Sequence, residues 1–126
     1  MKIYGIGTDI VSVDRIKKSL KNKNFLIRLF CKEEMLKCAK LIYPYNCYAK
    51  RFAAKEAFSK ALGTGISNGI NFNEIIVMNE KNGKPFIKLK GNTMKIIKKK
   101  FKKKPKIALS LSDEKKYAVA FVTISL

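Results

Sequence analysis

The chain has 126 residues, 47% of them hydrophobic and 29% charged, which favours one globular domain over two. Its formal net charge of +19 predicts a positive field that attracts anionic partners. The chain contains no histidine, which excludes Ser-His-Asp, Cys-His and histidine-rich zinc chemistry. We therefore expect residues 1–126 to form a single domain whose acids, bases and metal ligands come from carboxylates, lysine, tyrosine or water.

The N-terminal part of the chain predicts a strand followed by a helix. Alternating side chains indicate a strand from Lys2 to Val11, with Asp9 near its end among apolar neighbours. Ser12 is a suitable N-cap for a short helix that follows with apolar residues at helical spacing.

The middle of the chain is predicted to be helical. Two shorter helical segments, Phe25 to Phe30 and Lys32 to Ile42, end at the Tyr43-Pro44-Tyr45 break. A longer helix is expected from about Cys47 to Leu62, and Gly63 ends it.

The C-terminal half predicts two β-hairpins with a helix between them. Glu74 to Asn79 and Phe86 to Leu89 flank an Asn-Gly turn, and Ile107 to Leu111 and Tyr117 to Ile124 flank a polar turn. Asn92 is the expected cap of the intervening helix. Because strands and helices do not alternate regularly, we predict an α+β fold with an antiparallel sheet packed against helices.

Three cysteines, Cys31, Cys38 and Cys47, show no CxxC spacing and have no histidine as a co-ligand. We expect free thiols that pack between helices in a reducing, cytoplasmic environment. A redox role for Cys38 and Cys47 is the alternative. The N-terminus does not resemble a secretory signal, and no apolar stretch is long enough to span a bilayer.

Two of the nine carboxylates are unusual in their sequence context. Most lie where solvated residues are expected: Glu33 and Glu34 in a helix, Glu74 and Glu80 beside a strand, and Asp113 and Glu114 in a turn. Asp9 and Glu56 instead lie among apolar or small residues, where a carboxylate is costly unless it meets a cation. Asp9 could simply cap a turn, and Glu56 could pair with Lys60. Together, however, hard oxygen ligands without histidine or thiolate favour Mg²⁺ held beside a phosphate.

The residues after Glu56 suit a diphosphate. Lys60 follows one helical turn later, and Gly63-Thr64-Gly65 offers bare backbone that could approach a ligand. The glycines could equally be an ordinary helix cap, and they match neither the Walker nor the dinucleotide spacing.

Eight lysines lie between Lys95 and Lys106, with Phe101 as the one aromatic residue among them. We interpret them as the solvated face of an amphipathic helix or as an attraction for an acidic partner. The alternative is a small basic nucleic-acid-binding module. Interleaved aromatic residues or arginines in this segment would favour that alternative more strongly. Only three of the 28 basic residues are arginine. This lysine bias is typical of an AT-rich genome, so part of the net charge can reflect codon usage and not function.

Four blocks, in order, resemble bacterial holo-[acyl-carrier-protein] synthase, the short, single-module type of 4'-phosphopantetheinyl transferase. They are GIGTDIVSVDRI at 5–16, RFAAKEAFSKALGTGI at 51–66, NGKP at 82–85 and SLSDEKKYAVAFV at 110–122. The resemblance implies that the enzyme transfers the 4'-phosphopantetheine of coenzyme A to a serine of apo acyl carrier protein in fatty acid biosynthesis, releasing adenosine 3',5'-bisphosphate.

The resemblance also implies roles for single residues. Asp9 and Glu56 become the Mg²⁺ ligands, Lys60 a partner of the diphosphate, and Arg15 a contact for the acidic carrier protein. Gly63, Thr64 and Gly65 become part of the loop against coenzyme A. The resemblance further implies a cytoplasmic homotrimer with active sites between subunits. Asp113 stands where many members have histidine, so its role is left open.

Overall fold

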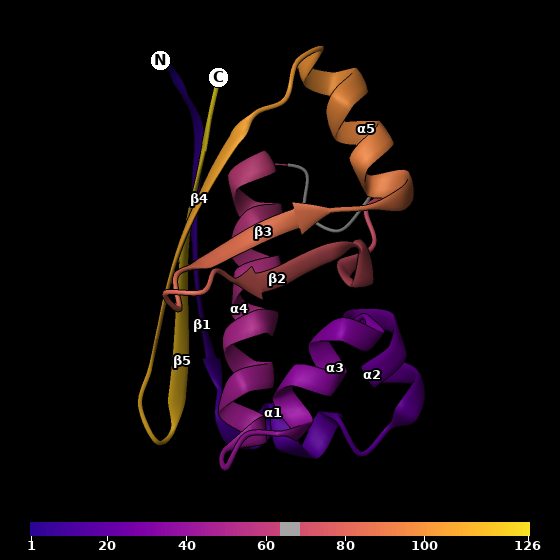
Figure 1. The fold of residues 1–126 in the computed structure, drawn as a ribbon, viewed down its shortest axis with the longest axis vertical. Helices are drawn as coiled ribbons and strands as arrows, with labels where there is room; N and C mark the ends of the chain where they lie inside the picture. Colours follow the sequence, from indigo (N-terminus) through magenta and orange to yellow (C-terminus); the bar gives the residue numbers. More distant parts are fainter. Residues whose placement is uncertain (64–68) are drawn as a thin grey trace.

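The computed structural model describes residues 1–63 and 69–126 and has an α+β fold (Figure 1). The elements, in chain order, are β1 (Ile3–Ser12), α1 (Val13–Ser19), α2 (Lys23–Leu29), α3 (Lys32–Ala39), α4 (Pro44–Leu62), a 3₁₀ turn (Phe72–Glu74), β2 (Ile75–Asn79), β3 (Pro85–Leu89), α5 (Gly91–Phe101), β4 (Lys106–Asp113) and β5 (Tyr117–Ser125). The predicted order of strands and helices is confirmed, and the predicted bounds differ by a few residues. Most notably, α4 begins at Pro44, where proline suits the first helical turn.

A three-stranded antiparallel sheet in the order β1-β5-β4 forms one layer. In its register Asp9 lies opposite Ala120 and Gly7 opposite Val122. Since side chains alternate along a strand, Asp9 lies on the face that covers α4, whereas Ile10 lies on the opposite, exposed face.

Helix α4 lies against the inner face of this sheet, and the β2-β3 hairpin crosses it on another side (Figure 1). It is therefore buried around most of its circumference. The helix approaches β1 closely because Gly5 and Gly7 lack side chains. A Cβ at Gly7 would collide with the Ala57 carbonyl oxygen, and a Cβ at Gly5 with that of Ala61. This close contact fixes how α4 presents its side chains to the end of β1.

A buried ion pair joins α4 to α3 and to β2. Lys55 donates to Glu34 Oε1 at 2.8 Å and to the Phe72 and Ile75 carbonyl oxygens at 2.8 and 2.6 Å. Glu34 also accepts from the Val77 N–H at 3.1 Å. The prediction of a solvated Glu34 is therefore wrong. The sequence shows α3 as a short polar helix, and only the packing of α3 against α4 removes this carboxylate from water.

Helix α5 is capped by an acid from outside the helix. Asn92, the predicted cap, lies inside the helix, which begins at Gly91. The Glu74 carboxylate instead accepts from the Asn92 and Thr93 N–H groups at 3.0 and 3.1 Å. The eight lysines between Lys95 and Lys106 are exposed, but α5 ends at Phe101. The interpretation of a solvated helix face is confirmed for the four within the helix: Lys95, Lys98, Lys99 and Lys100.

The prediction of three free thiols is wrong for two of them. Cys38 at the end of α3 and Cys47 in the first turns of α4 form a disulfide, and Cys31 is free. Residues 40–43 turn the chain between the two helices. Their cysteine Cα atoms therefore lie 5.5 Å apart, within the range that a disulfide spans.

Candidate active site

Asp9 and Glu56 face one cavity of about 310 Å³ at the end of β1. Asp9 reaches it from the inner face of the sheet and Glu56 from α4, so two residues 47 positions apart meet because β1 packs on that helix. The apolar part of the wall includes Val11, Ile16, Phe25 and Phe52. The cavity therefore holds two acids in a wall that is partly apolar, and Arg15 and Ser19 complete the lining.

The electrostatics of this pair favour a bound cation. Burial raises the pKa of Glu56, and the nearby Asp9 charge raises it further, while Lys60 opposes this effect. Two carboxylates that repel each other in a half-buried site are stabilised by a cation between them, and carboxylate oxygens are the ligands that Mg²⁺ prefers. No group of three or more Asp, Glu, Cys or His is placed to hold a metal in residues 1–63 and 69–126. The two carboxylates fit Mg²⁺ all the same, because this ion usually keeps several waters.

Lys60 contacts the aspartate of the pair. Its ammonium lies 3.0 Å from Asp9 Oδ1 and 3.0 Å from the Thr8 carbonyl oxygen, and its side chain is half exposed. The alternative interpretation was an ion pair between Lys60 and Glu56 within one helix. The structure instead pairs Lys60 with Asp9 on β1. Because the side chain is half exposed, an anion from solvent can reach the ammonium while it stays beside Asp9.

Arg15 lines the same cavity from α1. Ser12 caps this helix as predicted, since its Oγ accepts from the Arg15 N–H at 3.3 Å. The guanidinium belongs to an exposed residue at the edge of the cavity, next to bulk solvent.

Gly63 ends α4 with φ of +81°, a left-handed conformation that strains other residues, and the space where a Cβ would lie is open. The interpretation of Gly63 as a helix cap is confirmed. Thr64 and Gly65, the other two residues of the predicted loop, lie outside the described residues.

Phe25 and Phe52 were missed from the sequence as parts of this site. Both line the cavity, Phe25 from α2 and Phe52 from α4. Phe52 lies four residues before Glu56 and so on the same face of the helix, which was a usable signal. Nothing in the sequence near Phe25 indicates that α2 folds back over this cavity.

Asp113, whose role the sequence left open, lies at the end of β4. It accepts from Asn46 Nδ2 at 2.9 Å and lies 3.5 Å from Lys50 Nζ. These contacts join the second hairpin to the first turns of α4.

A larger hollow of about 1120 Å³ lies between β3, α5 and β4. The described residues that line it are mainly apolar, with Glu80 as their one carboxylate. The chemistry of paired acids therefore points to the smaller cavity. Within the described ranges, no helix is long and apolar enough to cross a membrane.

A family model described as the 4'-phosphopantetheinyl transferase superfamily matches residues 5–122. Among curated proteins, the chain is 52% identical over 125 residues to a holo-[acyl-carrier-protein] synthase of Pelagibacter ubique, covering 98% of each chain.

Solved structures give the same result. The chain matches the holo-[acyl-carrier-protein] synthase of Neisseria meningitidis with a TM-score of 0.87 at 40% identity, covering 98% of this chain and 99% of that one. It also matches the Bacillus anthracis enzyme of the same name, solved in complex with CoA (3',5'-ADP), with a TM-score of 0.81 at 35% identity over the full length of both chains.

Proposed function

Since the chain belongs to the 4'-phosphopantetheinyl transferase superfamily, we propose that it is a holo-[acyl-carrier-protein] synthase. It transfers the 4'-phosphopantetheine of coenzyme A to a serine hydroxyl of apo acyl carrier protein and releases adenosine 3',5'-bisphosphate. The observation that carries this proposal is the meeting of Asp9, Glu56 and Arg15 at one cavity, with Lys60 on Asp9. Residues 1–126 then form a single transferase domain.

Asp9 and Glu56 would hold Mg²⁺, in keeping with their mutual repulsion. The ion, when bound, supplies positive charge that stabilises the negative charge developing on the diphosphate oxygens. Lys60 adds a second cation beside Asp9, where it can meet the diphosphate. Gly63, and Thr64 and Gly65 beyond it, would bring bare backbone against coenzyme A.

In the reaction, the serine oxygen attacks the β-phosphorus of coenzyme A and the bond to the α-phosphate oxygen breaks. The serine proton must be accepted by a group other than histidine, because the chain has none. We assign this role to a water held by Glu56, which passes the proton on to the Glu56 carboxylate, while Asp9 acts chiefly as a ligand. Most of the catalytic effect then comes from positioning and charge stabilisation.

Arg15 would contact the carrier protein. Its exposed guanidinium at the edge of the cavity suits a carboxylate of an acidic protein whose serine must reach the Asp9–Glu56 pair. The net charge of +19 would speed the encounter of the two proteins.

The exposed face of the three-stranded sheet supports self-association, and the homotrimer is what the family resemblance implies. Ile6 and Ile10 on β1 are 61% and 65% exposed. On β5, Val119 lies opposite Ile10, and Phe121 lies opposite Thr8, between the two isoleucines. Contiguous apolar surface of this kind usually marks an interface. We propose that this face packs against neighbouring copies of the chain, with active sites between subunits.

The enzyme would act in the cytoplasm, in fatty acid biosynthesis, where its two substrates are used. The direct experiment is to incubate the protein with apo carrier protein, coenzyme A and Mg²⁺ and to measure the carrier protein by mass spectrometry. The proposal predicts a mass increase of one phosphopantetheine group that needs coenzyme A and is lost with a chelator. An unchanged carrier protein, with a known transferase active in parallel, would refute it. Tight, salt-dependent RNA binding would favour the nucleic-acid alternative.

A further inference from the structure

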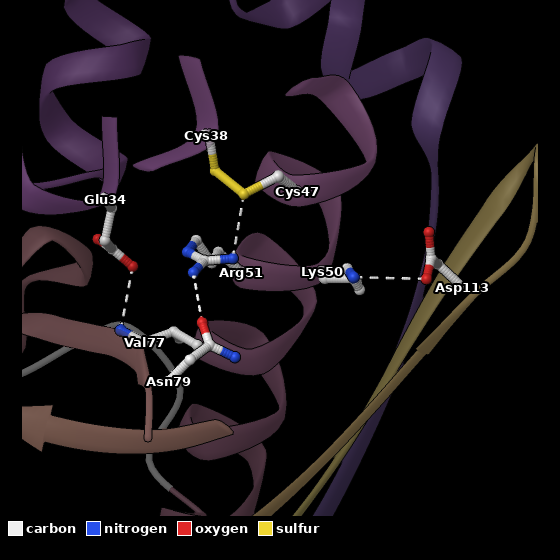
Figure 2. Close-up of a disulfide and its surroundings, with 8 residues drawn as sticks. All are labelled: Glu34, Cys38, Cys47, Lys50, Arg51, Val77, Asn79 and Asp113. Atoms are coloured by element: carbon white, nitrogen blue, oxygen red, sulfur yellow. Dashed lines mark hydrogen bonds and ion pairs between the residues drawn. A yellow bond between two sulfur atoms is a disulfide. The ribbon is translucent and has the colours of Figure 1, made fainter. Parts of the chain in front are cut away.

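The disulfide between Cys38 and Cys47 lies beside a buried arginine (Figure 2). Arg51, one helical turn after Cys47 on α4, donates from one terminal nitrogen to Cys47 Sγ at 3.1 Å. Its other terminal nitrogen donates to Asn79 Oδ1 at 3.1 Å. Both cysteines are at most 2% exposed, and Arg51 is 4% exposed.

Arg51 is a buried cation whose hydrogen-bond acceptors are neutral. Burial lowers the pKa of its guanidinium, which reflects the cost of keeping the charge away from water. Its Nε has no hydrogen-bond partner among the described residues. No carboxylate of the described residues lies within ion-pair distance of the Arg51 guanidinium. A buried charge of this kind is costly, so an anion at Cys47 would be strongly stabilised.

Other charged groups near Arg51 are already engaged. Glu34 attracts Arg51 at longer range, but its carboxylate is bound by the Lys55 ammonium at 2.8 Å and by backbone N–H groups. Burial raises the pKa of Tyr48, which keeps its phenol neutral near pH 7. The free thiol Cys31, at the start of α3, also acts on Arg51, but at longer range than a hydrogen bond. Among the described residues, Cys47 is the group in direct contact with the guanidinium that can become negative.

We propose that Cys38 and Cys47 are a redox-active pair, in which reduction releases Cys47 as a thiolate that pairs with the Arg51 guanidinium. Disulfides in the reducing cytoplasm, where we place this protein, are usually transient, which agrees with a reversible pair. The proposal concerns the disulfide alone and does not depend on the transfer activity.

The exchange is balanced with a small dithiol as the reductant. Both sulfurs are buried in the closed fold, so the exchange begins when the contact between α3 and α4 opens locally. One thiolate of the dithiol then attacks Cys38 Sγ, the bond between the two cysteines breaks, and Cys47 leaves as a thiolate beside Arg51. The second thiol of the reductant then displaces Cys38, which leaves as a thiol, and the reductant closes to a cyclic disulfide. Two electrons pass to the protein, one reductant proton remains on Cys38 and the other goes to water. Arg51 favours reduction because its charge stabilises the Cys47 thiolate in the product, and a thiol of low pKa also leaves faster.

The first test is the thiolate absorbance of the reduced protein near 240 nm, followed as a function of pH. Cys31→Ser is the background, because it removes the remaining free thiol. We expect one thiolate to form with a pKa of about 6, about 2.5 pH units below the ordinary cysteine pKa of about 8.5, because a much smaller shift would hardly change the reduced fraction at pH 7. This measurement needs no reagent to enter the buried site. Thiolate absorbance that rises only at or above the ordinary cysteine pKa would overturn the proposal. Failure of the Cys31→Ser protein to form the disulfide in oxidising buffer would also overturn it.

The second test is the equilibrium of the Cys31→Ser protein with mixtures of reduced and oxidised dithiothreitol at pH 7. The fraction reduced is read by alkylation after acid quenching and by mass spectrometry. We expect Arg51→Met to shift the equilibrium about tenfold toward the disulfide, or about 30 mV for this two-electron exchange.

Lys50→Met is the matched control for the loss of one charge from the same helix. Figure 2 shows Lys50 pointing toward Asp113, away from the disulfide, at an Nζ to Oδ1 distance of 3.5 Å. We expect a shift of less than about twofold for this variant. Equal shifts in Arg51→Met and Lys50→Met would refute the specific role of Arg51. If Arg51→Met does not fold, the absorbance measurement on the Cys31→Ser background still decides the question.

Discussion

The two acids of the cavity differ in how they are compensated. Asp9 has the Lys60 ammonium at 3.0 Å, whereas burial and the charge of Asp9 raise the pKa of Glu56. In the absence of a cation this arrangement is electrostatically unfavourable. Proteins usually keep such an arrangement where a ligand needs it, at some cost to stability.

We predict that Asp9→Asn and Glu56→Gln each lower Mg²⁺-dependent transfer by about a hundredfold or more, because each removes a carboxylate from the charge-stabilising site. The Glu56→Gln variant should unfold at the same or a higher temperature than the parent protein, since it relieves repulsion with Asp9. Transfer rates and calorimetry measure the two effects. Full activity in either variant would remove the metal assignment, and a large loss of thermal stability would mean that these acids support the fold.

At the scale of the elements, charged groups far apart in sequence fix how helices pack. Glu34 on α3 and Lys55 on α4 form one buried pair, and Glu74 before β2 caps α5. Burial raises the pKa of Glu74, but hydrogen bonds from Asn71, Thr93 and Asn92 together lower it below its ordinary value of 4.5. An acid with a lowered pKa in the folded state stabilises that state when it is ionised.

We predict that Glu74→Gln lowers the free energy of unfolding by about 1 kcal/mol at pH 7, the usual value of a helix cap. The contribution of Glu74 is complete above about pH 4.5 and is lost as the pH falls through the lower pKa of the folded state. The difference between the two proteins should therefore shrink below pH 4, as measured by urea unfolding. Glu80→Gln, at an exposed position, is the control and should change little. A difference that persists unchanged at low pH would contradict an ionic cap.

At the scale of the whole molecule, the inner and outer faces of the β1-β5-β4 sheet have different partners. The inner face covers α4, while the outer face leaves Ile6, Ile10 and Phe121 in contact with solvent. Leaving such a surface exposed is unfavourable in water, and self-association would remove it.

We predict that Ile10→Lys converts the proposed trimer into monomers and abolishes transfer, because a lysine in the centre of the apolar face would have to be buried without a partner. Light scattering after gel filtration measures the mass. Ile42→Lys, at an 88% exposed position in the loop before α4, is the control and should leave the trimer intact. A monomeric parent protein, or an Ile10→Lys trimer, would exclude this face as the interface.

The net charge of +19 leads to a kinetic prediction. Raising the salt concentration from about 0.01 to 0.15 M shortens the range of electrostatic attraction from about 30 to about 8 Å. We expect the KM for the acidic carrier protein to rise about tenfold or more, and the KM for coenzyme A to rise much less. Steady-state assays with each substrate varied in turn measure both. Equal changes would show that the positive surface does not steer the carrier protein.

The sequence by itself determined the strands, the helices and the identity of the two unusual acids. These follow from local rules: alternating side chains define β1, Ser12 caps α1, Gly63 ends α4, and an Asn-Gly turn joins β2 to β3. Asp9 and Glu56 stood out because a carboxylate among apolar residues is costly wherever the chain folds.

Only the tertiary structure decided which charges lose water and which groups meet. Lys60 pairs with Asp9 across two elements, Glu34 is buried under Lys55, and Cys38 bonds to Cys47. The first depends on the packing of α4 against β1, which Gly5 and Gly7 permit because they place no side chain in that contact. The other two depend on the packing of α4 against α3. Sequence patterns indicate which face of an element is apolar. Whether two side chains from different elements meet depends on the distance between those elements, and that distance is fixed only when the core packs.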